Sequence, residues 1–247
     1  MKRRYVFLLI LLSALMTLAI GFPLRTLETQ YPQMHQFGTI EGHPTAGQLS
    51  PKPPFAPHVE TATWQFNPST LLKAQLGTHL TLSGPKLNFT ADAAIGLSQT
   101  IEFDHLDGRA QASVILDILN NNMVSLDGLI VAQDIGGKIK DQWLLDPKGQ
   151  LVWRNAKIGG FVDIDLGQVV AEFSNDESTN IVEVANTGGM LAISGLIQVK
   201  PDRSYSLDAT IKPTTNAQDF DFILSQVGQR NADGSYRVVR EGNLGAL

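Results

Sequence analysis

The chain has 247 residues, a formal net charge of −5 and no cysteine. The acidic balance leaves no electrostatic footprint for nucleic acid, and the lack of cysteine excludes disulfides, thiolate metal sites and thiol nucleophiles. The length admits one large β domain or two small ones, held together by side-chain burial and backbone pairing.

An uncharged run from Tyr5 to Leu24 directly follows three cations at residues 2–4. As a helix that rises about 1.5 Å per residue, this run spans the roughly 30 Å hydrocarbon core of a bilayer. The positive-inside rule keeps the three cations in the cytoplasm. We therefore expect residues 1–24 to form a cytoplasmic tip and a single transmembrane anchor in a bacterial inner membrane, with the rest of the chain in the periplasm.

A cleaved signal peptide is the alternative reading of the same run, because Ala19 and Gly21 are small residues suited to a cleavage site. The apolar run is longer than the usual signal-peptide core of about 7 to 15 residues, which favours the anchor. Both readings export the remainder. Without the three N-terminal cations that remainder carries 16 basic against 24 acidic residues, a balance that favours solubility.

Residues 25–58 are expected to connect the anchor to the main domain. They contain one short β-like piece at residues 38–42, and then five prolines between Pro44 and Pro57. Proline donates no backbone hydrogen bond and biases the preceding residue to extended conformations. The proline-rich part is therefore predicted to be a surface loop or a semi-rigid linker.

Residues 59–247 are predicted to form a periplasmic β domain, because apolar and polar residues alternate from Val59 onward. Ala62, Trp64 and Phe66 are assigned to one face of the first strand. About a dozen such strands, separated by Gly, Pro and Asp turns, predict an antiparallel meander. A sheet of this width must curl, close or fold over because its twist accumulates, so we expect a wide, curved sheet that is open or resembles a half-barrel.

Turns are predicted where Gly, Pro and Asp cluster: at residues 84–85, 107–108, 136–137, 146–149, 174–179, 201–203 and 233–234. One or two short helices are expected. Residues 110–122 have apolar side chains at helical spacing, and so do residues 220–227, with Asp219 near the N-terminal end and Gly228 placed as the C-cap.

The clearest hairpin is predicted at residues 191–211. Most of its apolar residues fall on one face of two strands, which we expect to be substantially buried. These residues are Leu191, Ile193, Ile197, Val199, Tyr205, Leu207, Ala209 and Ile211.

No residue is assigned a catalytic, cofactor-binding or metal-binding role. The five histidines, His35, His43, His58, His79 and His105, lack ligand spacing. Asp163 and Asp165 lie two apart on a predicted strand and could act as a cation or acid–base pair, but the polar face of an amphipathic strand explains them better. The common hydrolase, phosphate-loop and dinucleotide motifs do not occur, and the three tryptophans are expected to pack in the core or at its rim.

The landmarks in their order resemble the family of protein N of the type II secretion system, over nearly the whole chain. The motifs are the N-terminal apolar segment, Gly38-Thr39-Ile40-Glu41-Gly42, Trp64-Gln65-Phe66-Asn67-Pro68 with Leu71-Leu72, Trp153-Arg154-Asn155-Ala156, Gly188 to Gly195, the closing helix Leu224 to Gly228, and Asp233 to Val238. The resemblance implies an inner-membrane protein with a periplasmic β domain that serves the export of folded proteins across the outer membrane. It implies other secretion components as partners and no enzymatic activity.

A second class of protein also fits. A curved, β-rich sheet behind one membrane anchor is similar to periplasmic lipid-transfer proteins of the AsmA type, for which a lipid would be the ligand. A groove lined continuously by apolar side chains would support lipid binding, and a closed, side-chain-filled core would support a scaffold. An enzyme is the third and weakest interpretation.

Overall fold

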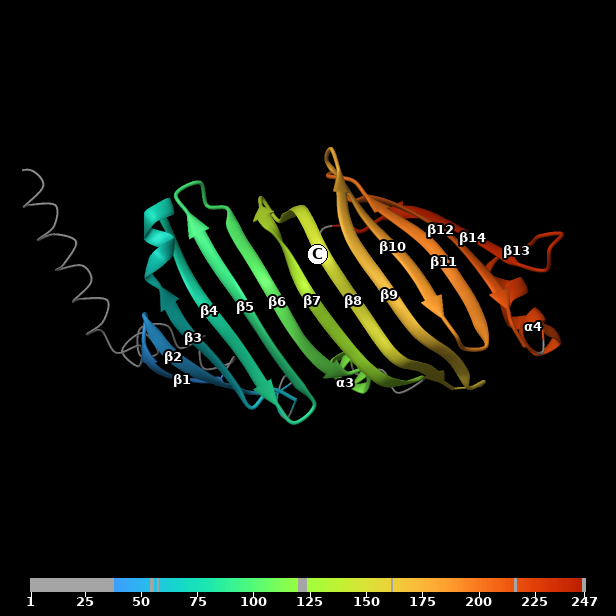
Figure 1. Cartoon of the computed structure of the whole chain (residues 1–247), viewed down its shortest axis with the longest axis horizontal. Coiled ribbons are helices and arrows are strands. Elements are labelled where there is room, and N and C mark those ends of the chain that lie inside the picture. Colours follow the sequence, from blue (N-terminus) through green and yellow to red (C-terminus); the bar gives the residue numbers. More distant parts are fainter. Residues whose placement is uncertain are drawn as a thin grey trace, which may run out of the picture. The chain divides into compact units, whose positions relative to one another are not determined.

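The computed structural model describes residues 38–53, 56, 58–119, 124–160, 162–215 and 217–245. The predicted mainly β fold is confirmed, since antiparallel strands in chain order dominate and the helices are few and short (Figure 1). The predicted anchor at residues 1–24 lies outside the described residues. No helix within the described ranges is long and apolar enough to span a bilayer.

The chain divides into two compact units, residues 1–96 and residues 97–247. The elements of the first unit are β1 (Gly38–His43), β2 (Ala46–Pro51), β3 (Thr61–Asn67), the 3-10 helix η2 (Pro68–Lys73), β4 (Gln75–Gly84) and β5 (Leu87–Gly96). Each strand pairs antiparallel with the next. The helix η2 begins at the Asn67 cap, whose Oδ1 accepts a hydrogen bond from the Ser69 backbone N–H at 3.1 Å.

The prediction of a loop through residues 44–57 is wrong for its first half, because residues 46–51 form β2, which pairs with both β1 and β3. The prolines permit this. Pro44 lies in the turn of the β1–β2 hairpin, and Pro51 is the last residue of β2. Neither position interrupts the ladder within the strand, where proline would remove a donor.

The second unit is a longer meander. Its elements are β6 (Ile101–Gln111), α3 (Ser113–Leu119), β7 (Ser125–Lys140), β8 (Trp143–Gly159), β9 (Ile164–Asp176), β10 (Thr179–Thr187), β11 (Leu191–Val199), β12 (Ser204–Pro213), α4 (Ala217–Val227), β13 (Gln229–Arg230) and β14 (Tyr236–Asn243). The strand order is the chain order except that β14 lies between β12 and β13. The two predicted helices correspond to α3 and α4, and the predicted hairpins at residues 174–179 and 191–211 are confirmed.

Three predicted turns are wrong, because residues 107–108, 136–137 and 146–149 lie inside β6, β7 and β8. At each place the ladder shifts register instead of reversing direction. Asp134, Asp146 and Gly149 have φ of 47°, 49° and 97°, the positive values that bulges use. The turn-forming residues therefore bend two strands of 16 and 17 residues without ending them.

Helix α4 packs against the strands at the C-terminal end of the second unit and contributes Phe220 and Leu224 to its core. The buried cluster comprises Ala156, Leu166, Leu191, Phe220, Leu224 and Tyr236. Gly228 ends the helix, and its backbone N–H donates to the Leu224 carbonyl at 2.9 Å. A side chain at Gly228 would approach the Arg237 carbonyl oxygen to 2.7 Å, so this glycine is required by close contact with β14.

Candidate binding surfaces on the second unit

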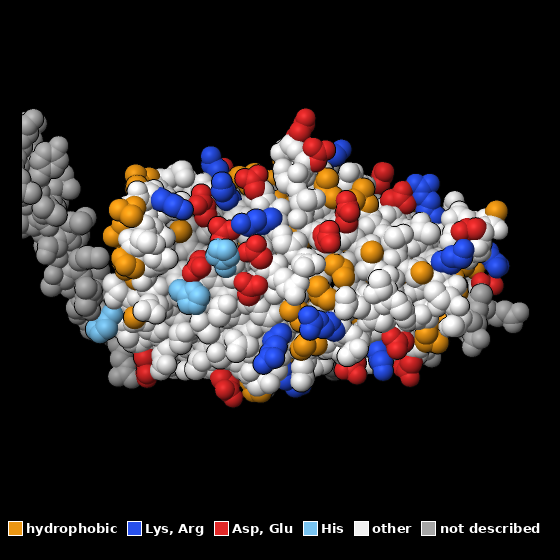
Figure 2. Space-filling model, viewed as in Figure 1, with side chains coloured by type: hydrophobic (Ala, Val, Ile, Leu, Met, Phe, Trp, Pro, Cys, Tyr) orange, Lys and Arg blue, Asp and Glu red, His pale blue; other side chains and the backbone are white. Residues whose placement is uncertain are grey.

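The ladder register of the second unit sorts its side chains onto two faces, because alternate residues of a strand point to opposite sides and paired residues point to the same side. One face, here called the polar face, carries mostly polar residues from β8 to β14. It includes Gln150, Glu172, Glu183, Ser194, Asp208, Thr210 and Arg237. Over β9–β12, the side turned toward the viewer in Figure 2 shows scattered hydrophobic and charged side chains among other side chains and backbone.

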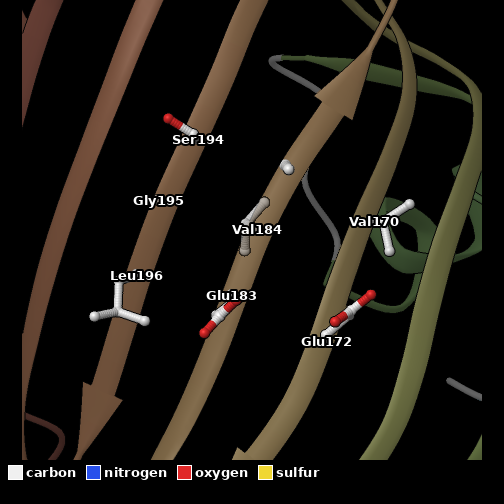
Figure 3. Close-up of a pocket in the computed structure, with 8 residues that line it drawn as sticks. Val170, Glu172, Glu183, Val184, Ser194, Gly195 and Leu196 are labelled. Carbon is white, nitrogen blue, oxygen red and sulfur yellow. The ribbon is translucent and has the colours of Figure 1, made fainter.

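A shallow depression of about 430 Å³ lies on the polar face across β9, β10 and β11 (Figure 3). Glu172 and Glu183 are ladder partners at its edge, and both are exposed. Like charges placed directly opposite each other disfavour pairing, and no ion pair to either carboxylate is found among the described residues. Val170 and Leu196 make the remaining wall partly apolar. The depression is open and holds no buried polar group.

The other face, here called the apolar face, is built from three parallel rows that cross the strands. The helix row, which lies beside α4, is Trp153, Val169, Asn186, Ile193, Ile211 and Tyr236. The central row is Leu151, Ala171, Val184, Gly195, Ala209 and Val238. The outer row is Phe173, Val182, Ile197 and Leu207, and it ends at Arg240.

Helix α4 packs mainly on the helix row, and its C-terminal end at Gly228 lies against Val238 of the central row. Phe220 and Leu224 reach the sheet beside Tyr236, and most of the helix row packs against this cluster. The central and outer rows are half-buried, with Val238 the one buried member. Within the described part of the chain, the main neighbours of β9–β12 are the adjoining strands. The predicted burial of the 191–211 hairpin is therefore only partly right, because Ile197 and Leu207 are half-buried on a face without a second layer.

One polar side chain, Asn186, interrupts the helix row, and its amide is fully engaged by the backbone. Its Nδ2 donates to the carbonyls of Leu166 and Leu191, both at 2.7 Å, and its Oδ1 accepts from the Ile193 backbone N–H at 2.6 Å. Buried amides are tolerated when they are bonded in this way. Asn186 thus ties the β10–β11 connection together and presents no free hydrogen-bonding group to the apolar face.

Arg240 is the charged end of the apolar face. Its Nη1 donates to the Val239 carbonyl at 3.0 Å, and its Nη2 donates to the Val227 carbonyl at the end of α4 at 2.9 Å. A cation is favourable at a helix C-terminus. A polar depression of about 310 Å³ adjoins it, lined by the end of α4, β13 and β14. Among the described residues, no carboxylate forms an ion pair with Arg240.

Local contacts elsewhere in the second unit shift the pKa values of Asp208, Arg237 and Tyr236. A hydrogen bond from Arg237 lowers the pKa of the Asp208 carboxyl and raises that of the Arg237 guanidinium. Burial, assisted by the hydrogen bond to Asp221, raises the pKa of the Tyr236 phenol. These groups form structural contacts between neighbouring strands and between β14 and α4, and their pKa shifts result from those contacts.

The histidines considered from the sequence are scattered. His79 Nδ1 lies 2.9 Å from Asp92 Oδ1, and His105 Nδ1 lies 3.0 Å from Asp134 Oδ1. His35 lies outside the described residues. Across the described ranges, no three His, Cys, Asp or Glu side chains gather into a group that could hold a metal ion.

Asp163 and Asp165 differ in their local bonding, although they line the same depression. Asp165 Oδ1 accepts the Gly167 backbone N–H at 2.8 Å and so shapes the start of β9. Asp163 is exposed, and both residues line a depression of about 390 Å³ together with Lys157. Local backbone bonding therefore explains the position of Asp165.

Trp64 and Trp153 each form a hydrogen bond to the backbone. Trp64 Nε1 donates to the His43 carbonyl at 3.1 Å, and Trp153 Nε1 donates to the Asp127 carbonyl at 2.9 Å. Trp153 also packs against the core cluster. The apolar face itself was not identified from the sequence, because its rows combine residues from six strands whose register the sequence does not specify. The alternation within each strand was the one available signal.

Comparison with known proteins agrees with these landmarks. The family model described as type II secretion system (T2SS), protein N matches residues 37–239, which is well over half of the chain and covers part of each unit. No curated protein and no solved structure shows significant similarity to the chain. The chain belongs to the protein N family of the type II secretion system.

Proposed function

We propose that this component of the type II secretion system is anchored in the inner membrane and acts in the periplasm by protein–protein contact during export of folded proteins across the outer membrane. Membership of the family supports a role in the type II secretion system. The uncharged run from Tyr5 to Leu24, behind three cations, supports the anchor and its orientation. The domain division into residues 1–24, 25–58 and 59–247 belongs to this proposal.

The observation that carries the contact role is the apolar face of the second unit. From β8 to β12 its central and outer rows are half-buried on a single layer of strands and do not belong to the core cluster beneath α4. Contiguous exposed apolar surface in soluble domains usually marks an interaction site. We assign the protein no catalytic step.

Crosslinking in the native envelope tests the contact role. The full chain is crosslinked in growing cells, purified under denaturing conditions and analysed by mass spectrometry. Recovery of inner-membrane secretion components is the expected result. Recovery of no secretion component would contradict the proposal.

The anchor needs its own test. Protein extracted from membranes is sequenced from its N-terminus. An intact N-terminus is expected from a retained anchor, whereas a mature chain that starts at Phe22 would identify a cleaved signal peptide.

A lipid-binding role of the AsmA-like kind remains the second candidate function. The specific observation in its favour is that the central row of the apolar face carries only apolar residues and lies mostly outside the closed core cluster. Recovery of phospholipid alone, with normal secretion in a deletion strain, would favour this candidate over protein contact.

A further inference from the structure

We propose that the end of the first unit that holds η2 inserts into the surface of the inner membrane, as a second membrane contact beside the anchor. This inference rests on the proposed anchor and adds to it a surface, a ligand chemistry and individual residues. The surface, here called the leucine tip, consists of Leu71, Leu72, Leu76 and Ile95.

The leucine tip gathers large apolar side chains at one end of the first unit. Leu72 is 92 % exposed, Leu76 62 %, Ile95 44 % and Leu71 37 %. Leu76 and Ile95 are ladder partners at the ends of β4 and β5 that adjoin η2, and Figure 2 shows hydrophobic side chains gathered over this end of the unit. Single exposed leucines are ordinary, but a cluster of them marks an interaction site.

The local sequence braces η2 against the sheet and leaves its leucines outside any core. Asn67 Oδ1 accepts hydrogen bonds from the Ser69 backbone N–H and hydroxyl, and Thr70 Oγ1 donates to the Asn67 carbonyl at 2.8 Å. A Cβ atom at Gly77 would lie 2.3 Å from Thr70 Cγ2, so the glycine lets η2 approach β4 closely. No residue of η2 is buried. The short helix therefore presents its two leucines to the surroundings in a fixed geometry.

The leucine tip suits an apolar surrounding because backbone groups beside it are hydrogen-bonded. The Ala74 backbone N–H donates to the Leu71 carbonyl at 3.0 Å and also to the Thr70 carbonyl. Leu76 and Ile95 belong to the paired β4–β5 ladder. Unpaired backbone groups are costly in lipid, so these bonds lower the cost of insertion.

The charge of this end favours an anionic lipid surface. Residues 67–78 and 93–100 contain no acidic residue, and their one charged side chain is Lys73, in the last turn of η2. The exported part of the chain is acidic overall, so this end differs from the rest. A lysine is attracted to an anionic bilayer surface, while apolar side chains beside it enter the boundary between headgroups and acyl chains.

The anchor brings the leucine tip within reach of that surface. Residues 25–37 join the uncharged run to β1, and a chain of this length spans at most about 45 Å. The start of β1 and η2 lie at opposite ends of the first three strands, because Gly38 pairs with Pro51 whereas Ala46 pairs with Gln65. A strand the length of β2 is about 20 Å long, well below this reach. The anchor thus raises the effective concentration of the leucine tip at the bilayer.

Fluorescence from single labelled cysteines tests the contact on the full chain, reconstituted in vesicles of phosphatidylethanolamine and phosphatidylglycerol. The chain has no cysteine, so Leu72→Cys and the control Asn88→Cys each carry one label. Asn88 is exposed and lies at the opposite end of β5 from Ile95. Lipids with brominated acyl chains should quench the label at position 72 and leave the label at position 88 nearly unquenched. Equal quenching at the two positions, or none at position 72, would overturn the inference.

Variants measured with a label in Leu76→Cys identify the contacting residues. Leu72→Asn should lower the ratio of inserted to free tip by at least about tenfold, the effect of losing one buried leucine. Phe222→Asn changes an apolar side chain of α4 that is 76 % exposed and should leave the ratio unchanged. Lys73→Gln should lower the ratio about fivefold in the anionic vesicles and not in vesicles of phosphatidylcholine alone. An unchanged ratio in Leu72→Asn would overturn the insertion, and an unchanged ratio in Lys73→Gln would overturn the preference for anionic lipid.

Flotation of the same vesicles separates this inference from the anchor on which it rests, and protease resistance shows that each variant is folded. A chain that floats with the vesicles but is not quenched at position 72 would end the inference and leave the anchor standing. A chain that does not float would contradict both. In the native envelope, p-benzoylphenylalanine in place of Leu72 should give a phospholipid adduct, and protein adducts alone would assign the leucine tip to a protein partner and overturn the membrane contact.

Discussion

The Tyr236 hydroxyl donates a hydrogen bond to Asp221 Oδ1 at 2.8 Å and thereby joins β14 to α4. Tyr236 is 1 % exposed and belongs to the buried cluster. Arg230 completes the arrangement, with its guanidinium 5.9 Å from the centre of the Tyr236 ring and 3.3 Å from Asp221 Oδ2. This contact fixes α4 at one end of the apolar face and so determines which rows the helix covers.

Removing the Tyr236 hydroxyl in Tyr236→Phe should weaken the attachment of β14 to α4 at neutral pH. Burial raises the pKa of Tyr236 above its ordinary value of 10.0. The folded state therefore favours the neutral phenol, and its stabilisation is complete below the ordinary pKa and lost as pH rises through the raised one. Urea titrations across alkaline pH should show falling stability in the wild type and a flatter profile in Tyr236→Phe. Parallel profiles would contradict the role of this phenol.

Helix α4 offers a matched pair of phenylalanines for testing the core. Phe220 is 1 % exposed, whereas Phe222 is 76 % exposed on the same helix. Phe220→Ala should lower the free energy of unfolding by about 3–5 kcal/mol because it leaves a cavity. Phe222→Ala should change it by less than about 0.5 kcal/mol. Similar losses in the two variants, measured by denaturant titration, would show that α4 does not pack as described.

Two isoleucines on β11 report how far α4 covers the apolar face. Ile193 packs against the core cluster, whereas Ile197 is half-buried in the outer row. Ile193→Ala should cost about 2–5 kcal/mol through cavity formation. Ile197→Ala should cost about 1–2 kcal/mol, less than the value for a fully buried side chain. A larger loss for Ile197→Ala than for Ile193→Ala would indicate that a second layer covers the outer row.

The ion pair between Asp208 and Arg237 should make stability depend on pH at the acid end. The hydrogen bond from Arg237 holds the pKa of Asp208 below its ordinary 3.8. The associated stabilisation is present above that ordinary value and is lost as pH falls through the lowered pKa. Thermal melts between neutral and strongly acid pH should show a weaker acid dependence in Asp208→Asn than in the wild type. Identical acid dependence would mean that the pair does not contribute.

The sequence predicted the meander, the two helices and the β11–β12 hairpin because these depend on local alternation and turn chemistry. It wrongly predicted turns at residues 136–137 and 146–149, which lie inside the two longest strands, β7 and β8. Gly and Asp clusters such as Asp107-Gly108 are compatible with both turns and bulges, and the choice depends on the partner strand. At Gly149, for example, a side chain would collide with the Asp134 carbonyl of β7, which is a tertiary constraint.

The candidate site was less predictable than the fold for a related reason. Val184 and Gly195 are neighbours only because β10 and β11 pair in one register. A shift of one residue would bring Glu183 to the apolar face. Composition indicated no metal or cofactor site, but the uncovered rows follow from the length and position of α4, which periodicity alone does not determine.

The central claim is that this chain serves the type II secretion system and acts outside the cytoplasm. The most direct measurement compares a folded exported protein in the periplasm and in the medium, in a deletion strain and in the same strain complemented with the full chain. The account predicts that the deletion leaves delivery to the periplasm intact, lowers the amount in the medium and is restored by complementation. Undiminished export to the medium in the deletion strain would contradict it.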